Sequence, residues 1–589
     1  MKKRSQIANE YKWDLSSYIK NESEINRIFS LMEELPTKLC KYNGKLNDKD
    51  LLFERLNSFN DEFCEINILA SYIGNSLHVN STDTEMLKYS QKFDNLYQKI
   101  SVANSYFIPQ MYELDTEYLN SLLLDKRIGN NDNFIKDIIK SKSHKLDEKT
   151  NTLLSQMGKF LSPGSNLHAQ MIDEIKYADI VDEKGKTYKL DNANISKFLQ
   201  GKNRTLRKNA YFSRLNAYKQ FNKTFAELYI TDLEECSFNS KLTNFKSTLE
   251  AELFEDDIPL SVFENNIQVV NSNIKILKNF IKTLKKLSKL KDFLYFDLLE
   301  DSGLNKKFTI EESKEIILNA LAPLGKEYLS IVKKKFSDKS IDYLPCEHKS
   351  TGGYCSNTYK AKTVILMNFV DDFNSLSTLI HEMGHCVNAE YFNSAQPYEK
   401  SGITIFAAEI ASTVNEILLN FYMQSHAKSK REKSYYLKQL LDSVNNTIFR
   451  QTLFSEFEHF AHTKIENEEN LTYEDLNNKY LELSKKYYGG ACIVPSAQQY
   501  EWMRVPHFYS SYYVFTYSTG MLTAITIANK LLNDNTFKDK YILFLKNGTN
   551  KPATEMLKEI GIDVTKKETF LDAFKFIENQ LQTYIDINK

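Results

Sequence analysis

The sequence predicts a mainly α-helical protein, and three observations support this fold class. The 589 residues include only 18 glycines and 10 prolines, so residues that break helices are rare. Long stretches, such as residues 267–299, carry apolar residues at spacings of three and four with lysines between them. Only two short regions have the alternating or β-branched character of strands. We therefore expect a helical body with a small β-sheet.

Three regions follow one another along the chain. Residues 1–115 are predicted to form an N-terminal region of amphipathic helices. Residues 116–195 are predicted to form a smaller connecting region that ends in a β-hairpin, because β-prone segments flank the turn sequence DEKG at residues 182–185. Residues 196–589 return to helical periodicity and contain the motifs that carry chemistry, so we assign them to a catalytic domain.

Composition excludes several classes of protein. Lys and Arg number 76 against 77 Asp and Glu, so bulk electrostatic binding of nucleic acid is not expected, and the lysines of residues 267–299 are interpreted as a solvated helix face. No apolar run of about 18 residues occurs, so no membrane span is expected. The seven cysteines are scattered and form no C-x-x-C pair, which is typical of reduced thiols, and we expect a cytoplasmic protein.

A second β region lies between residues 351 and 369. Residues 363–369 are short and apolar and predict a buried strand. Gly352, Gly353 and Tyr354 are predicted to lie on a neighbouring edge strand, whose glycines allow another backbone to approach closely. An exposed edge can bind an extended peptide by strand addition, so these three residues are candidates for substrate binding. The alternative is a small sheet that binds no ligand.

The strongest chemical signal is the sequence HEMGH at residues 381–385. Residues four apart on a helix lie one turn apart, so His381 and His385 can reach the same tetrahedral ion. Glu382 is rotated by one residue and can reach water at the metal, which is the role of a general base in H-E-x-x-H peptidases. Both histidines lie opposite an apolar stripe formed by Leu376, Leu379, Ile380, Met383 and Val387. The alternative is a solvated helix that carries two histidines.

A catalytic zinc site needs a third protein ligand. The next predicted helix, which begins after Gly402, places Glu409 and Glu416 beside its apolar face. A helical return would bring Glu409 to the two imidazoles as the third ligand of one zinc ion. Glu416, two turns further on, is better placed to orient a ligand histidine. Either acid could instead be a surface charge.

These residues resemble the zinc site of a known family. HEMGH followed by FAAEIASTVNE is similar to the zinc site of the thimet-oligopeptidase family, and more closely to its bacterial oligoendopeptidase F branch. NEYKWDL near the start, RQTLFSEFE at residues 450–458 and EWMRVPHFYSSYYVFTYSTG at residues 501–520 also resemble that branch. The resemblance extends from about residue 8 to beyond residue 570.

The resemblance implies a cytoplasmic zinc endopeptidase for short, unstructured peptides. It implies a two-lobed helical ellipsoid around a deep channel, with zinc held by His381, His385 and Glu409. It also assigns His507, Tyr513 and Tyr517 to binding of the transition state. Tyr513 and Tyr517 stand four residues apart, and we expect them on one helical face, where phenolic donors can stabilise a developing oxyanion.

Two other classes of function remain open at this stage. One is a zinc carboxypeptidase on a related helical core, and the other is a helical scaffold that binds peptides without cleaving them. The sequence does not distinguish a monomer from a homodimer, and it does not indicate which residues flank the cleaved bond.

Overall fold

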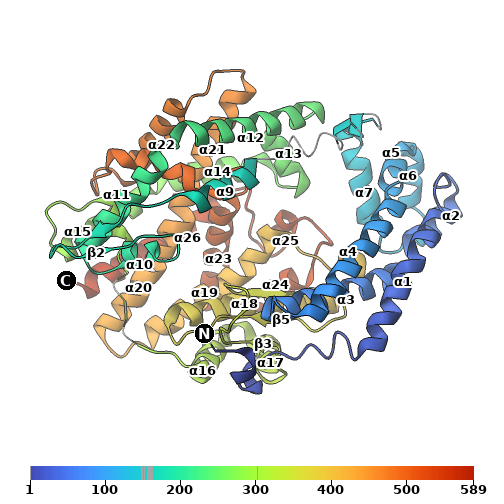
Figure 1. Ribbon diagram of the computed structural model, residues 1–589, viewed down its shortest axis with the longest axis horizontal. Coiled ribbons are helices and arrows are strands. Elements are labelled where there is room, and N and C mark those ends of the chain that lie inside the picture. Colours follow the sequence, from blue (N-terminus) through green and yellow to red (C-terminus); the bar gives the residue numbers. More distant parts are fainter. Residues whose placement is uncertain (1, 148–149, 152, 155–163, 302, 305) are drawn as a thin grey trace. The chain divides into compact units, whose positions relative to one another are not determined.

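The computed structural model describes residues 2–147, 150–151, 153–154, 164–301, 303–304 and 306–589. Over these residues the chain is mainly helical, with one two-stranded and one three-stranded sheet, which confirms the predicted fold class (Figure 1). No helix in this described part is both long and apolar enough to cross a membrane.

The chain forms two compact units, each assembled from separate segments of the sequence. The first unit comprises Met1–Lys145, Lys306–Leu419 and Lys530–Ile560. The second unit comprises Leu146–Asn305, Asn420–Asn529 and Gly561–Lys589. Two of the five boundaries between the units fall inside helices, one in α19 (Ile405–Ser425) and one in α23 (Phe515–Asn533).

The N-terminal segment of the first unit is a series of amphipathic helices. They are α1 (Glu22–Cys40), α2 (Lys49–Asn57), α3 (Asn60–Val79), α4 (Thr84–Asn104), α5 (Phe107–Glu113), α6 (Thr116–Leu123) and α7 (Asp132–Ser141). The side chains of Asn21, Asp48 and Asp83 accept hydrogen bonds from the first turns of α1, α2 and α4, as helix-capping residues do. Their apolar faces form one buried core, which also includes Val364 and Leu366.

The three-stranded sheet lies in the first unit. Its strands are β3 (Ile341–Asp342), β4 (Tyr354–Ser356) and β5 (Val364–Leu366), in the order β3-β5-β4. β5 is fully buried and pairs parallel to β3 and antiparallel to β4, with Cys355 opposite Ile365. The predicted buried strand and a neighbouring edge strand are thus both present, but the placement of Gly352 and Gly353 on the edge strand was wrong, because β4 begins only at Tyr354.

The first unit contains further helices after the N-terminal segment. They are α16 (Ile310–Ala320), α17 (Gly325–Ser337), α18 (Phe373–Ala395), the first part of α19, α24 (Phe537–Lys546) and α25 (Ala553–Glu559). α18 packs against β4, β5, α17 and α24.

The second unit is also helical. Its helices are α9 (Gly164–Glu174), α10 (Ile195–Gln200), α11 (Arg204–Lys219), α12 (Asn222–Leu242), α13 (Thr248–Glu255), α14 (Leu260–Ser272), α15 (Ile274–Ser288), α20 (Lys430–Val444), α21 (Arg450–Glu466), α22 (Tyr473–Tyr488), most of α23, and α26 (Lys567–Ile587). The predicted hairpin is present as β1 (Ile180–Val181) and β2 (Thr187–Tyr188), which pair antiparallel. The periodic stretch 267–299 is not one helix: α14 ends at Ser272, and Lys289 adopts a left-handed conformation directly after α15.

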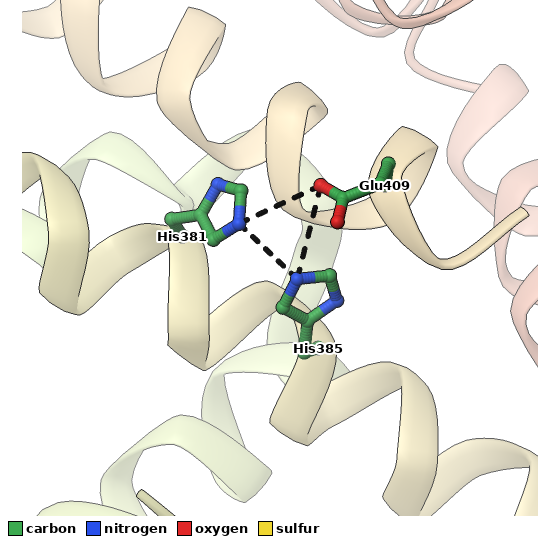
Figure 2. A group of neighbouring side chains, drawn as sticks. All are labelled: His381, His385 and Glu409. Atoms are coloured by element: carbon green, nitrogen blue, oxygen red, sulfur yellow. Dashed lines mark hydrogen bonds and ion pairs between the residues drawn. The ribbon is translucent and has the colours of Figure 1, made fainter. Parts of the chain in front are cut away.

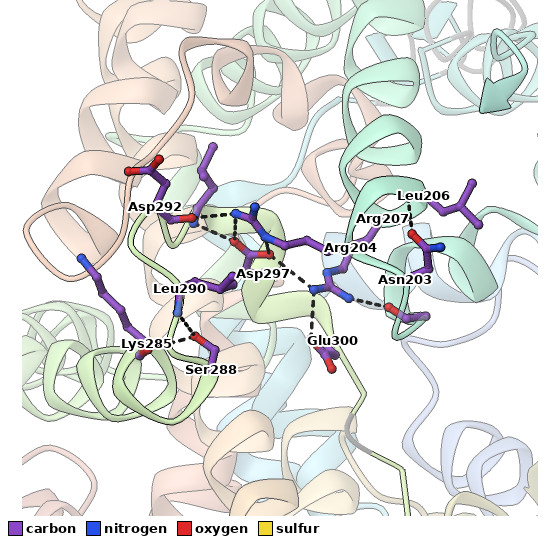
Figure 3. A network of polar contacts seen from close by, with 12 residues as sticks. Asn203, Arg204, Leu206, Arg207, Lys285, Ser288, Leu290, Asp292, Asp297 and Glu300 are labelled. Atoms are coloured by element: carbon purple, nitrogen blue, oxygen red, sulfur yellow. Dashed lines mark hydrogen bonds and ion pairs between the residues drawn. The ribbon is translucent and has the colours of Figure 1, made fainter. Parts of the chain in front are cut away.

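A buried ion-pair network fastens α11 to the short helix at Tyr295–Leu299. The carboxylate of Asp297 accepts hydrogen bonds from Arg204 at 2.8 Å, and Arg207 lies 3.4 Å from the same carboxylate (Figure 3). Arg207 also pairs with Glu300 at 2.9 Å. Asp297 and Arg207 are almost completely buried, so each charge depends on its partners, and we interpret this network as structural.

Candidate active site

The HEMGH residues lie in the middle of α18. The helix begins where the carboxylate of Asp372 accepts a hydrogen bond from the backbone N–H of Ser375 at 2.7 Å, as helix-capping residues do. The predicted apolar stripe is fully buried. His381 and His385 are only partly buried, so the same helix presents one face to the core and a polar face that carries both imidazoles.

His381, His385 and Glu409 converge as the sequence predicted, with one ligand atom of each within 4.8 Å of the others (Figure 2). The two Nε2 atoms are 3.1 Å apart, and Glu409 Oε2 lies 3.7 Å from His381 Nε2 and 4.0 Å from His385 Nε2. A tetrahedral zinc ion with ligand bonds near 2.1 Å separates its ligand atoms by roughly 3.4 Å. The donor set therefore fits zinc in both chemistry and spacing. Over the described residues, no other group of three His, Cys, Asp or Glu side chains converges in this way.

α19 orients both imidazoles. Glu416 Oε1 lies 2.5 Å from His381 Nδ1, which is the position predicted for a residue that orients a ligand. The ring of His385 hydrogen-bonds to the backbone of Ala408. These contacts with α19 hold each imidazole ring so that its Nε2 atom faces the other Nε2 atom and Glu409. Hydrogen-bonded partners orient metal-binding histidines in the same way.

Close contact between α18 and α19 makes this geometry possible. Gly384 lies directly against α19, and a Cβ at this position would be only 2.6 Å from Ser412 Cα. One turn further along α19, the amide of Asn415 donates to the carbonyl of Ile380 at 3.2 Å and accepts from the hydroxyl of Tyr328 at 3.0 Å. The contribution of Asn415 was not anticipated from the sequence, where its only signal is a polar side chain beside the buried Val414.

The site combines burial with concentrated negative charge. Burial raises the pKa of Glu382 to about 7. Burial alone would lower the pKa of His381, but its hydrogen bond to Glu416 raises that pKa to about 9. Burial and the neighbouring His381 lower the pKa of His385 to about 3. Since metal ligation requires neutral imidazoles, a metal ion at this site competes with the proton on His381.

β4 passes directly over α18. A Cβ at Gly353 would lie 3.1 Å from Thr378, one turn before His381, and Gly352 has a φ of +82° that favours glycine. The backbone N–H of Cys355 hydrogen-bonds to Glu382. The hydroxyl of Tyr354 points to α3, where it donates to Asn75 at 3.0 Å. The predicted edge strand is therefore adjacent to Glu382, and the Tyr354 hydroxyl is already engaged.

His507, Tyr513 and Tyr517 gather in the second unit. The hydroxyl of Tyr517 is 3.4 Å from His507 Nε2, and the rings of Tyr513 and Tyr517 are 5.2 Å apart. The prediction that both tyrosines lie on one helix was wrong, because α23 begins only at Phe515. Tyr512 adopts a left-handed conformation with φ of +53°, and this interrupts the helical path just before Tyr513.

Comparison with known proteins identifies similar chains over nearly the whole length. The model of peptidase family M3 matches residues 197–576. Oligopeptidase PepF of Bacillus subtilis is 33% identical over 98% of this chain and 87% of its own length, and an oligoendopeptidase F homolog of Lactococcus lactis is 30% identical over 98% of each chain.

Solved structures agree with these sequence relatives. The crystal structure of a peptidase from Chlamydophila abortus has a TM-score of 0.94 and 27% identity, and covers 100% of both chains. That of oligoendopeptidase F from Enterococcus faecium has a TM-score of 0.73 and 28% identity, and covers 96% of this chain and 99% of its own.

Proposed function

The chain belongs to peptidase family M3 and is a metalloendopeptidase acting on oligopeptides, and we propose that His381, His385 and Glu409 bind its single catalytic zinc ion. One observation carries this proposal: the three ligand atoms lie within 4.8 Å of one another, and Glu416 contacts the far nitrogen of His381. A zinc ion bound there would act as a Lewis acid toward water and the scissile carbonyl.

Glu382 is the proposed general base. It lies on the same turn of α18 as the ligand His381, and its carboxylate is largely buried. Its raised pKa, about 7, suits a group that takes a proton from the attacking water and then passes it to the leaving amine. The backbone N–H of Cys355 hydrogen-bonds to Glu382 and restrains its carboxylate.

His507, Tyr513 and Tyr517 are the proposed donors to the oxyanion that forms during attack. The contacts among the three side chains support a shared role, since the Tyr517 hydroxyl reaches His507 Nε2 and the ring of Tyr513 lies beside the rings of both. Burial and Arg450 lower the pKa of His507, which favours a neutral ring at pH 7. A single donor to an oxyanion commonly contributes about 3 kcal/mol to the activation free energy.

The backbone of Gly352 and Gly353, directly before β4, together with the free edge of β4, is the proposed binding site for the substrate main chain. β4 is an edge strand, since its pairing within the sheet is to β5 alone. An extended peptide added along that edge would run beside Glu382. We assign Tyr354 to holding this strand on α3, where its hydroxyl contacts Asn75 and His78.

We also propose a cytoplasmic location, on the basis of the seven free and scattered cysteines. Short peptides are the proposed partners, and no nucleic-acid partner is proposed because the charge is balanced. We propose either a monomer or a homodimer, and a measurement of the mass in solution distinguishes the two.

The decisive experiment compares Glu382→Gln with the wild-type enzyme on a quenched peptide blocked at both termini. An endopeptidase cleaves such a peptide, whereas a carboxypeptidase or a non-hydrolytic scaffold does not. We expect Glu382→Gln to keep one zinc per chain and to lose at least about 100-fold in kcat. Glu555→Gln, which makes the same change at an exposed acid on α25 of the first unit, is the control and should keep zinc and activity. Near-normal turnover of Glu382→Gln would remove the base assignment.

A further inference from the structure

The second unit contains a pocket that is lined in part by Tyr513. Its volume is about 410 Å³, within the range of small-ligand pockets. Three segments line it: α12, α13 with the residues that follow it, and residues 509–516. The lining contains five carboxylates and no Lys, Arg or His side chain. These carboxylates belong to Asp232, Glu235, Glu252, Glu255 and Asp256.

We infer that this pocket binds a basic side chain of the peptide substrate, an inference that rests on the proposed function. Nothing in the described part of the chain neutralises its central charges: no Lys or Arg forms an ion pair with Asp232, Glu235 or Glu252. Burial and the nearby Glu235 raise the pKa of Asp232 to about 7, which is the expected effect of crowding carboxylates without a cation.

Another buried acid contacts the wall of the pocket and adds to its negative charge. Glu458 is completely buried on α21, and one of its carboxylate oxygens accepts a hydrogen bond from the backbone N–H of Tyr512, which lines the pocket. The other oxygen, Oε2, has no hydrogen-bond partner, and Glu458 interacts electrostatically with Asp232 and Glu252. The hydroxyl of Tyr509, another lining residue, is likewise buried and unpaired. An unpaired buried polar group is costly, and a donor-rich cation in the pocket offsets that cost at the Tyr509 hydroxyl and reduces the repulsion of Asp232 and Glu252 with Glu458.

The arrangement suits an elongated organic cation better than a metal ion. A metal requires several ligand atoms to converge, and over the described residues only the zinc triad does so. The pocket carboxylates instead surround a cavity whose other walls include Leu253, Ile258 and Phe515. Lysine and arginine combine a charged end with an apolar stem, and they match a pocket that combines acidic and apolar walls.

The position of the pocket connects it to cleavage. Tyr513 lines the pocket and contacts Tyr517 and His507, the proposed oxyanion donors. A side chain seated in the pocket would therefore belong to a residue close to the bond that is cleaved. The pocket thus acts as a specificity site, which selects basic residues at one position of the peptide.

Peptides that differ in one side chain test this inference. A series of quenched peptides, acetylated and amidated at their ends, carries either lysine or its uncharged analogue norleucine at each position in turn. We expect one position at which lysine raises kcat/KM about tenfold over norleucine in the wild-type enzyme. Asp232→Asn and Glu252→Gln should each lower that ratio severalfold. A ratio measured on one preparation does not depend on the fraction of folded protein.

Glu234→Gln is the matched control. Glu234 is an exposed acid on the same helix, directly beside Glu235, and does not line the pocket, so the lysine preference should persist. Binding of the same peptides to the inactive Glu382→Gln enzyme, followed by fluorescence anisotropy, provides a readout that does not require turnover.

Each alternative has its own outcome. If the wild-type enzyme cleaves the lysine and norleucine peptides equally at every position, or the preference survives both substitutions, the inference is wrong while the proposed function stands. If a norleucine peptide with a free amino terminus binds more tightly than its acetylated form, and lysine has no effect, the pocket takes the peptide end and the side-chain assignment is overturned. Stoichiometric binding of calcium to the zinc-loaded enzyme, abolished by Asp232→Asn, would overturn it in favour of a metal. Failure to cleave any blocked peptide would instead contradict the proposed function.

Discussion

Substitution of Gly384 by alanine tests whether the contact between α18 and α19 controls the metal site. The added Cβ would lie 2.6 Å from Ser412 Cα, 3.0 Å from the carbonyl oxygen of Ala411 and 3.1 Å from Asn415 Nδ2. Carbon atoms in contact are normally about 3.5–4.0 Å apart, so the helices must separate by roughly 1 Å. The first two obstacles are backbone atoms of α19, which a side-chain rotation cannot remove.

Two opposing effects determine the stability of this variant. Overpacking of this kind costs about 1–3 kcal/mol of folding free energy. Replacing glycine by alanine inside a helix stabilises by about 1 kcal/mol. The expected net loss in the free energy of unfolding of the metal-free protein is therefore small, about 0–2 kcal/mol.

Metal affinity should fall much more than stability. Glu409 lies one turn before Ser412 on α19, so a displacement of α19 by roughly 1 Å exceeds the tolerance of about 0.2 Å in metal–ligand distances. We expect at least about tenfold weaker zinc binding, measured by competition with a chromogenic chelator, and a parallel loss of peptidase activity at limiting zinc.

Gly74→Ala is the control for this prediction. Gly74 lies inside α3, and no heavy atom would lie within 4 Å of an added Cβ. This variant should be as stable as the wild-type protein or more stable, by about 1 kcal/mol, with unchanged zinc affinity. If Gly384→Ala also binds zinc as tightly as the wild-type protein, then the close helix contact does not set the position of Glu409.

Three further substitutions test separate parts of the molecule. Glu416→Gln replaces the carboxylate that contacts His381 Nδ1, so zinc affinity, measured by chelator competition, or activity should fall by about 10–100-fold. Unchanged zinc affinity would contradict the orienting role of Glu416. Tyr513→Phe should lower kcat by about 100-fold with little change in KM, and a change confined to KM would argue against an oxyanion donor. Burial alone would raise the pKa of Glu501, but Arg450 and Arg504 lower it to about 2. Its stabilising contribution is therefore complete above its ordinary pKa and disappears as the pH falls toward 2. Glu501→Gln should lower the melting temperature at pH 7 and flatten the acid branch of the stability profile, whereas an unchanged acid branch would contradict this sign.

The parts of the active site that follow from local periodicity were predictable from the sequence. The spacing of His381 and His385 fixes their common helix face, and the apolar stripe of α18 indicates which face is buried. The same reasoning on α19 selected Glu409 and Glu416, because helix periodicity places both acids beside a buried face.

The parts that depend on tertiary contacts were not predictable. The need for glycine at Gly384 arises from the distance between two helices, which no local pattern reports. The break before α23 comes from a left-handed Tyr512, a residue type that rarely signals such a conformation. The acids of the pocket lie close together in the sequence, on α12 and on α13 with the residues after it, but the wall formed by residues 509–516 is distant in the sequence, so the pocket itself becomes apparent only in space.

The two helices of the zinc site contribute different ligands, and this links metal binding to folding. α18 supplies both imidazoles, whereas α19 supplies Glu409 and the groups that orient the two rings, so neither helix alone holds a complete ligand set. A metal that binds only the assembled pair stabilises it by about 2.7 kcal/mol when its free concentration is 100 times its dissociation constant. By the same linkage, any substitution that loosens the contact must weaken metal binding, even when it touches no ligand. Asn415 and Gly384 therefore belong to the metal site in an energetic sense, because they hold the two halves of the ligand set together.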